Sequence, residues 1–218
     1  GYGPNAEFAA ALALQASSIQ QFCDSLPELA FVWTNGRLGR VILDVKASTS
    51  GAVGNGAREI VKLLPIKEVD PEAYLQEQHH EAVFTHLDTH QYFCRKTDAG
   101  FDKSEFYTQP ELYQSNFGAF AEKSNVYIPC HFWSSKSPFI LTKQMLQDPT
   151  CQLQVVADVS CDIDGPIACT IRPSKIGASM YGYDPKTGLE VDMLQPGAIA
   201  VMAVDNLPCE LSKDAAED

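Results

Sequence analysis

Short apolar runs alternate with polar, helix-forming segments along most of this chain. Segments of this length, bounded by glycine, proline and capping residues, are typical of buried strands separated by helices. The alternation predicts an α/β fold, with a doubly wound, mainly parallel sheet and helices on both of its faces. The expected strands lie at 41–47, 66–69, 82–84, 125–129, 153–159 and 199–204.

Two segments break this alternation. Residues 1–39 open with a turn and continue as an alanine-rich run that ends at Pro27, so we expect a short N-terminal helical segment ahead of an α/β domain at 40–218. Residues 90–122 are aromatic and acidic, and we interpret them as a helical insertion whose aromatic side chains form core rather than a ligand cage. Residues 181–188 carry the proline and glycine typical of a hairpin turn.

Composition and charge narrow the class of protein. The 218 residues are 45% hydrophobic, which suffices for a core, and their formal net charge of −12 disfavours nucleic acid or an anionic membrane as a partner. No apolar run approaches the roughly 18 residues of a membrane span. The 7 cysteines include no CxxC pair, which favours a reducing compartment over a disulfide framework or a zinc site. We therefore expect an intracellular location, either cytoplasmic or, for a processed chain, a mitochondrion or plastid.

A glycine-rich turn follows the first expected strand. Gly51, Gly54 and Gly56 precede a helical run, and glycine there lets the backbone approach a pyrophosphate at the start of the helix. Glu68 or Asp70, after the next strand, then occupies the position at which a Rossmann-like domain holds a ribose diol. The spacing is GxxGxG rather than GxGxxG, and the first strand carries charges. A glycine-rich loop between an edge strand and a helix is therefore the alternative.

Polar residues also follow three of the later strands. Cys130 and His131 follow one strand, Asp158 opens the polar loop DVSCDIDG, and Asp205 follows the last strand. Because carboxyl ends of parallel strands meet at one edge, this clustering favours a cofactor crevice there. The alternative for His131 is a hydrogen-bonded histidine beneath an aromatic lid. The aspartates around Cys161 predict a raised thiol pKa, which argues against a nucleophile. The loop lacks a calcium-ligand pattern, so we expect no metal.

Four segments of the chain resemble one known family. They are VYIPCHFW, VVADVSCDIDGPIACTIRPS, YGYDPKTG and VMAVDNLPCEL. They are similar to the dinucleotide-binding domain of lysine-forming saccharopine dehydrogenases and lysine–ketoglutarate reductases, in the wider alanine dehydrogenase and transhydrogenase group. The resemblance covers roughly residues 40–215, and the turn GAVGNGA looks like the GxVxxGA turn of this family.

The resemblance implies a reaction and a set of site residues. The reaction is hydride transfer between NAD or NADP and the imine of lysine and 2-oxoglutarate, with Asp205 near the nicotinamide as the catalytic candidate. The resemblance assigns the glycine turn to the pyrophosphate and the loop after the 125–129 strand to the nucleotide. Together with the strand-end acids, the expected cofactor-binding residues are Ser50, Gly51, Val53, Gly54, Glu68, Asp70, Cys130, His131 and Asp158.

The chain also departs from the family pattern. Family enzymes have a preceding domain that supplies acid–base groups and most of the substrate pocket, and residues 1–39 are too short to be that domain. We therefore expect its partners to be the missing substrate domain or other protein subunits. The alternative function is a catalytically inactive Rossmann-like subunit that serves as a structural component of a larger complex. Lys67, next to Glu68, keeps NADP open beside NAD.

Overall fold

The structure is a computed structural model that describes residues 41–45 (as backbone), 57–58, 61–62, 66–80, 82–131 and 133–206. The expected N-terminal helical segment at 1–39 and the glycine turn lie outside the described residues. The domain boundary near residue 40 stays a prediction.

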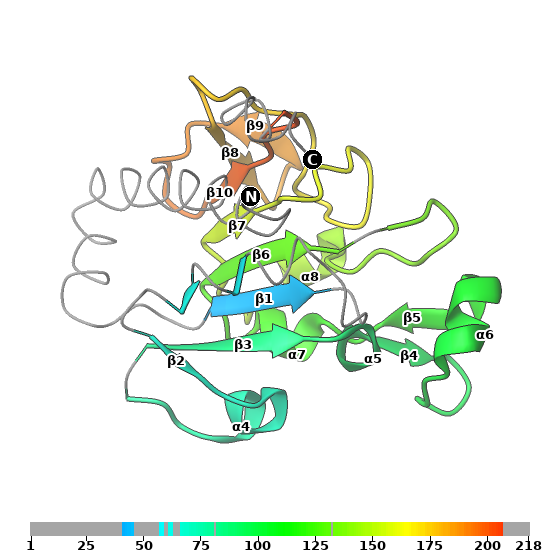
Figure 1. Ribbon diagram of the computed structural model, residues 1–218. Coiled ribbons are helices and arrows are strands. Elements are labelled where there is room, and N and C mark those ends of the chain that lie inside the picture. Colours follow the sequence, from blue (N-terminus) through cyan, green and yellow to red (C-terminus); the bar gives the residue numbers. More distant parts are fainter. Residues whose placement is uncertain are drawn as a thin grey trace, which may run out of the picture.

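Eight strands form one sheet across the described part of the chain. They are β1 Val41–Val45, β2 Lys67–Glu68, β3 Val83–Leu87, β6 Val126–Cys130, β7 Val155–Ala157, β8 Met180–Asp184, β9 Leu189–Val191 and β10 Ile199–Met202. Their order is β2-β3-β1-β6-β7-β10-β8-β9 (Figure 1). Neighbours from β2 to β10 pair in parallel, whereas β8 pairs antiparallel with both β10 and β9. The predicted α/β class is confirmed.

The strand order departs from the usual doubly wound arrangement at one end. In the usual arrangement, the second strand of the chain lies beside the first. In this chain, β3 lies between β2 and β1. β2 is only 2 residues long and pairs with β3 alone. At the other end, residues 181–188 form the expected hairpin, because Gly182 pairs with Val191 and Asp184 with Leu189. This hairpin adds an antiparallel edge that the apolar pattern did not predict.

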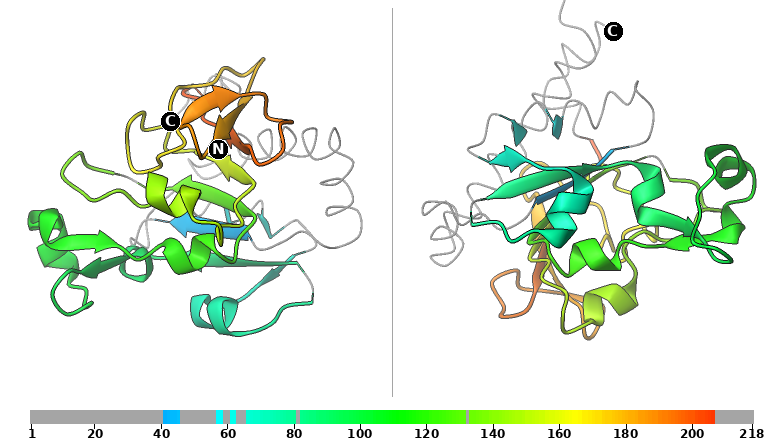
Figure 2. Two further views of the ribbon diagram at one scale, coloured as in Figure 1. Left: turned by 180° about the vertical axis from the view of Figure 1, so that it is seen from behind. Right: turned by 90° about the horizontal axis from the view of Figure 1, so that it is seen from below.

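Three described helices cover one face of the sheet, whereas the helical residues Ala57 and Val61 pack on the other. The three helices are α4 Pro71–Gln76, α7 Gly118–Ala121 and α8 Lys143–Gln147, which lie on the same side in the right-hand view of Figure 2. Two of them begin at residues whose side chains cap the helix. The Asp70 side chain accepts from the backbone N–H of Glu72, and the Thr142 hydroxyl accepts from that of Met145.

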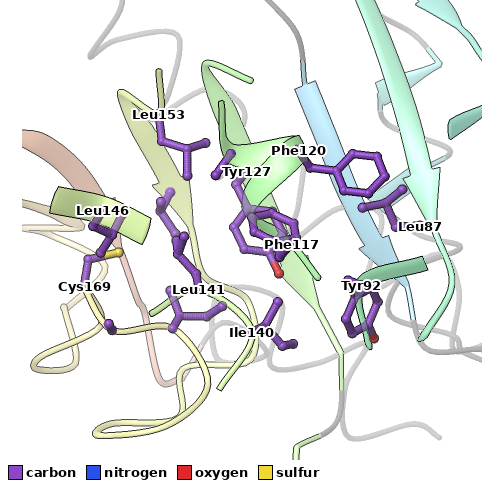
Figure 3. Close-up of a cluster of buried hydrophobic side chains, with 14 of the residues drawn as sticks. Leu87, Tyr92, Phe117, Phe120, Tyr127, Ile140, Leu141, Leu146, Leu153 and Cys169 are labelled. Atoms are coloured by element: carbon purple, nitrogen blue, oxygen red, sulfur yellow. The ribbon is translucent and has the colours of Figure 1, made fainter. Parts of the chain in front are cut away.

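Alternating side chains on the strands point to opposite faces of the sheet and join different cores there. Tyr127, Val156 and Val201 face the helices and join the larger core, whose aromatic and aliphatic side chains interlock in Figure 3. Ile128 and Met202, one residue further along their strands, belong to a second cluster on the opposite face. β7 and β10 are buried throughout, as central parallel strands should be.

The segment predicted as a helical insertion is only partly helical. It contains α5 Thr89–Tyr92, α6 Lys103–Thr108, the 3₁₀ helix η1 Pro110–Leu112 and α7, but also an antiparallel pair formed by β4 Phe93–Arg95 and β5 Tyr113–Ser115. β4, β5 and α6 project beyond the carboxyl ends of β1 and β3 (Figures 1 and 2). The core role predicted for the aromatics is confirmed at the buried residues Phe106, Tyr113, Phe117 and Phe120. It is wrong for Tyr107, which is 50% exposed.

Candidate functional site

The polar strand ends predicted from sequence do meet at one edge of the sheet. β6 ends at Cys130 and β7 at Ala157, and backbone hydrogen bonds continue past both ends. The N–H of Val159 donates to the carbonyl of Pro129 at 3.1 Å, and the N–H of Asp158 donates to that of Met202 at 2.7 Å. The loops that leave β6, β7 and β10 therefore begin side by side.

Asp158 is fully buried and organises the loop that it opens. One carboxylate oxygen, Oδ1, accepts from the N–H of Ser160 at 3.0 Å, the hydroxyl of Ser160 at 2.5 Å and the N–H of Cys161 at 3.1 Å. The other, Oδ2, accepts from the hydroxyl of Thr170 at 2.5 Å. The Asp158 side chain is 0% exposed. Sequence reasoning placed this residue correctly at the strand end but missed Thr170, because nothing in the sequence marks that hydroxyl as its partner.

Cys161 connects this loop to the residue that follows β10. Its S–H donates to the carbonyl of Ala203 at 3.1 Å. Burial, and then the charges of Asp158, Asp205 and Asp162, raise the pKa of the Cys161 thiol to about 11. The predicted rise of this pKa is confirmed, and a thiolate nucleophile is disfavoured.

His131, which follows β6, interacts electrostatically with Asp162, which lies in the loop after β7. Burial, followed by the negative charge of Asp158, raises the pKa of the Asp162 carboxyl, and His131 opposes that rise. His131 is 6% exposed, so it lies in the wall of this edge rather than on its rim. Asp162 belongs to the predicted polar loop, yet sequence reasoning did not select it, because spacing alone does not rank three nearby aspartates.

Asp205 is exposed just beyond β10. The segment before it is held by Ser174, whose N–H donates to the carbonyl of Ala203 at 2.7 Å and whose hydroxyl accepts from the N–H of Ala203 at 3.0 Å. Asp205 contributes to the raised pKa of Cys161 and therefore lies in the same neighbourhood as Asp158 and Asp162. Its predicted position at the polar edge agrees with this geometry, while its chemical role stays a prediction.

Glu68 and Asp70 lie at the far end of the same edge. β3 and β1 separate β2 from β6, a distance of about 14 Å at ordinary strand spacing. Asp70 caps α4, as described above. The Glu68 carboxylate pairs with Arg58 at 2.5 Å and with Lys62 at 3.3 Å. Burial alone would raise the pKa of Glu68, but Arg58 and then Lys62 more than offset it, so this pKa is lowered.

Part of the helix that follows the glycine turn is described. Ser50, Gly51, Val53 and Gly54 lie outside the described residues. The helical residues that follow the turn are placed: Ala57 and Val61 are buried in the second cluster with Ile128 and Cys130 of β6. The start of the predicted pyrophosphate-binding helix therefore packs on the strand whose end carries His131.

A hollow of about 1020 Å³ lies at the opposite edge of the sheet. Its walls come from the end of α8, the turn between β8 and β9, and the segments that precede β7 and β10. These are amino ends of parallel strands, so the hollow is separate from the polar edge. Within the described ranges, no three His, Cys, Asp or Glu side chains converge as metal ligands, and no helix has the length and apolar character to cross a membrane.

These features define an α/β domain of the kind that holds ligands at the carboxyl edge of a parallel sheet.

The chain is similar in sequence to several known proteins. Alpha-aminoadipic semialdehyde synthase of Arabidopsis thaliana is 28% identical over 188 residues, which is 77% of this chain and 18% of that protein. The mitochondrial synthase of Rattus norvegicus is 27% identical over 190 residues, which is 77% of this chain and 20% of that protein. Saccharopine dehydrogenase (NAD(+), L-lysine-forming) of Neurospora crassa is 34% identical over 95 residues, 43% of this chain and 24% of that enzyme.

The chain is therefore similar to the alpha-aminoadipic semialdehyde synthases over 77% of its length and to a saccharopine dehydrogenase over 43% of it. No family model matches it. The chain spans about one fifth of the length of the synthases that it matches.

Proposed function

We propose that this chain binds a nicotinamide dinucleotide at the carboxyl edge of its sheet, as the cofactor domain of a saccharopine dehydrogenase-like oxidoreductase. The proposal treats residues 40–218 as one Rossmann-like, doubly wound domain. Its main support is the meeting of the β6, β7 and β10 loops at one edge, in a chain whose relatives carry dehydrogenase and synthase names. The cofactor, when bound, supplies the hydride chemistry, and the protein supplies position and electrostatics.

The two halves of the dinucleotide take different parts of this edge. The glycine turn residues Ser50, Gly51, Val53 and Gly54 hold the pyrophosphate, supported by the packing of the following helix on β6. The adenosine half lies toward β2, and the nicotinamide half lies toward β7 and β10. On that side Asp205, which is exposed, orients the nicotinamide or its substrate.

The surroundings of Glu68 favour the 2′-phosphorylated cofactor. A carboxylate at this position holds the ribose diol of NAD when its oxygens are available. In this chain, Oε1 is already paired with Arg58 and Oε2 with Lys62. Two cations beside one carboxylate leave a net positive charge, which suits a 2′-phosphate. We therefore propose that NADP binds more tightly than NAD.

Titration of the full chain with NADH and NADPH, followed by cofactor fluorescence or calorimetry, tests the proposal. We expect saturable binding with NADPH the tighter ligand. If neither cofactor binds at millimolar concentration, the oxidoreductase proposal is wrong and the alternative of a structural subunit gains support.

Substitution of the two cations tests the cofactor choice. Arg58→Gln removes a charge-assisted contact, so we expect NADPH affinity to fall about 10-fold with little change for NADH. Lys62→Gln should act in the same direction. Lys67→Gln is the matched control, because Lys67 lies on β2 but makes no described pair with Glu68. Equal losses for NADH and NADPH would show that Arg58 supports the fold rather than the phosphate.

A further inference from the structure

The carboxylate of Asp158 is engaged by partners within the protein. Three donors from Ser160 and Cys161 converge on Oδ1, and the Thr170 hydroxyl donates to Oδ2. The side chain is also completely buried. A dinucleotide could reach it only by displacing these partners.

The loop that Asp158 holds has a backbone that needs such support. Cys161 and Asp164 have φ angles of 49° and 54°, in the left-handed region that non-glycine residues rarely adopt. At Gly165, a Cβ would lie 2.5 Å from the carbonyl oxygen of Asp162, so the turn tolerates only glycine there. Conformations of this kind persist when the surrounding contacts hold them in place. Asp158 provides those contacts from inside the molecule, and Cys161 adds one to Ala203, just after β10.

This loop borders one particular half of the proposed crevice. It follows β7, which lies with β10 on the opposite side of β1 from β2 and β3. In a doubly wound sheet the two mononucleotide halves bind on either side of the point where the strand order reverses. The half near the glycine turn and β2 takes the adenosine, so the β7 loop faces the nicotinamide.

We infer that Asp158 is a positioning residue that does not touch the dinucleotide but holds the loop 160–164 in shape beside its nicotinamide half. This inference rests on the proposed function. It also changes the role expected for Asp158 from sequence, where it was grouped with cofactor-binding residues.

Binding measurements on the full chain separate positioning from direct contact. Asp158→Ala should weaken NADPH binding at least about 10-fold, because it removes the acceptor of the hydrogen bonds from Ser160, Cys161 and Thr170 that shape the loop. The affinity for 2′,5′-ADP should stay within about 2-fold of wild type, because this ligand occupies only the adenosine half and the loop lies beside the nicotinamide half. Asp158→Asn should recover most of the NADPH affinity, since its oxygen accepts from the N–H groups of Ser160 and Cys161 and its amide donates to Thr170.

Loop shape can be followed without any cofactor. Iodoacetamide labelling of Cys161, measured by mass spectrometry, should be at least about 5-fold faster in Thr170→Val, because a loosened loop releases the thiol toward its ordinary pKa. Cys151 is the internal reference: it is partly buried at the opposite edge, where burial raises its pKa, and its labelling rate should not change. Thr170→Val also carries the test if Asp158→Ala does not fold.

The possible outcomes are distinct. Equal loss of NADPH affinity in Asp158→Asn and Asp158→Ala overturns the inference in favour of a direct charge contact. Unchanged NADPH binding in Asp158→Ala overturns it, as do unchanged labelling and affinity in Thr170→Val. Wild-type protein that binds neither NADPH nor 2′,5′-ADP overturns the proposed function and this inference together. Wild-type binding that none of the variants affects overturns only the inference.

Discussion

At the scale of single residues, Gly182 is required by close backbone packing rather than by a turn. It lies within β8, and a Cβ at this position would lie 2.6 Å from both the backbone N and the Cα of Met193, and 2.7 Å from the carbonyl oxygen of Val191. Backbone atoms cannot move aside as the end of a flexible side chain can. Gly177 offers a contrast, because a Cβ there would meet nothing within 4 Å.

Alanine substitutions at these two glycines should therefore differ sharply. We expect Gly182→Ala to lower the free energy of unfolding by about 2 kcal/mol through overpacking. Gly177→Ala should leave it unchanged or raise it by about 0.5 kcal/mol, since it restricts the unfolded chain. Urea denaturation of both variants measures the difference. Similar values for the two would show that the segment around Met193 yields without cost.

Asp162 should make stability depend on pH in an unusual direction for a carboxyl. Its pKa is raised in the folded chain by burial and by Asp158, so the folded state disfavours ionisation. The protonated Asp162 carboxyl favours the folded state. This contribution to stability is complete below the ordinary pKa of 3.8, and it is lost as pH rises through the raised pKa of the folded chain. Asp162→Asn should therefore be more stable than wild type at pH 7, and this advantage should vanish in acid. Thermal unfolding across pH measures it, with Asp164→Asn, exposed in the same loop, as the control.

At the scale of elements, the cap of α4 distinguishes Glu68 from Asp70, the two alternatives for the acid that contacts the cofactor ribose. Asp70→Ala should cost about 1 kcal/mol of stability, because the N–H of Glu72 loses its acceptor, whereas Asp70→Asn should cost little. Neither should change the preference between NADH and NADPH, which we assign to the surroundings of Glu68. A shift of that preference in Asp70→Asn, measured by cofactor fluorescence, would move the assignment to Asp70.

Elements with a strong local signal could be predicted from the sequence. β10 is a continuous apolar run, and Thr142 and Asp70 are caps that act within three residues. β4 and β5 could not be predicted, because each is only 3 residues long and neither alternates clearly between apolar and polar positions. At the site, residues that end strands were found, but partners that depend on the packing of distant segments were not. Thr170 is the plainest case, since only the folded loop brings it to Asp158.

At the scale of the whole molecule, we expect the chain to bind the cofactor without turning over substrate. The chain spans only 18% to 20% of the synthases that it resembles. Holding substrate beside the nicotinamide can be worth ~7–11 kcal/mol of barrier. We therefore expect NADPH to bind while absorbance at the cofactor band stays constant with lysine and 2-oxoglutarate. Saccharopine formation at an ordinary enzymatic rate would show that these 218 residues, alone or as an oligomer, complete the site.

The position of β1 in the sheet also governs how the chain reaches this structure. Val41 pairs with Phe84 on one side, while Val45 pairs with Cys130 on the other. No stretch of chain shorter than 41–130 therefore contains β1 together with both of its neighbours. Such distant pairings form slowly, because large loops must close before any contact compensates for the lost entropy. On the ribosome, β1 emerges long before β6, and one of its two hydrogen-bonding edges waits unpaired through the synthesis of the intervening residues. This interval is when the nascent chain is most open to pairing with another copy of itself or to capture by a chaperone.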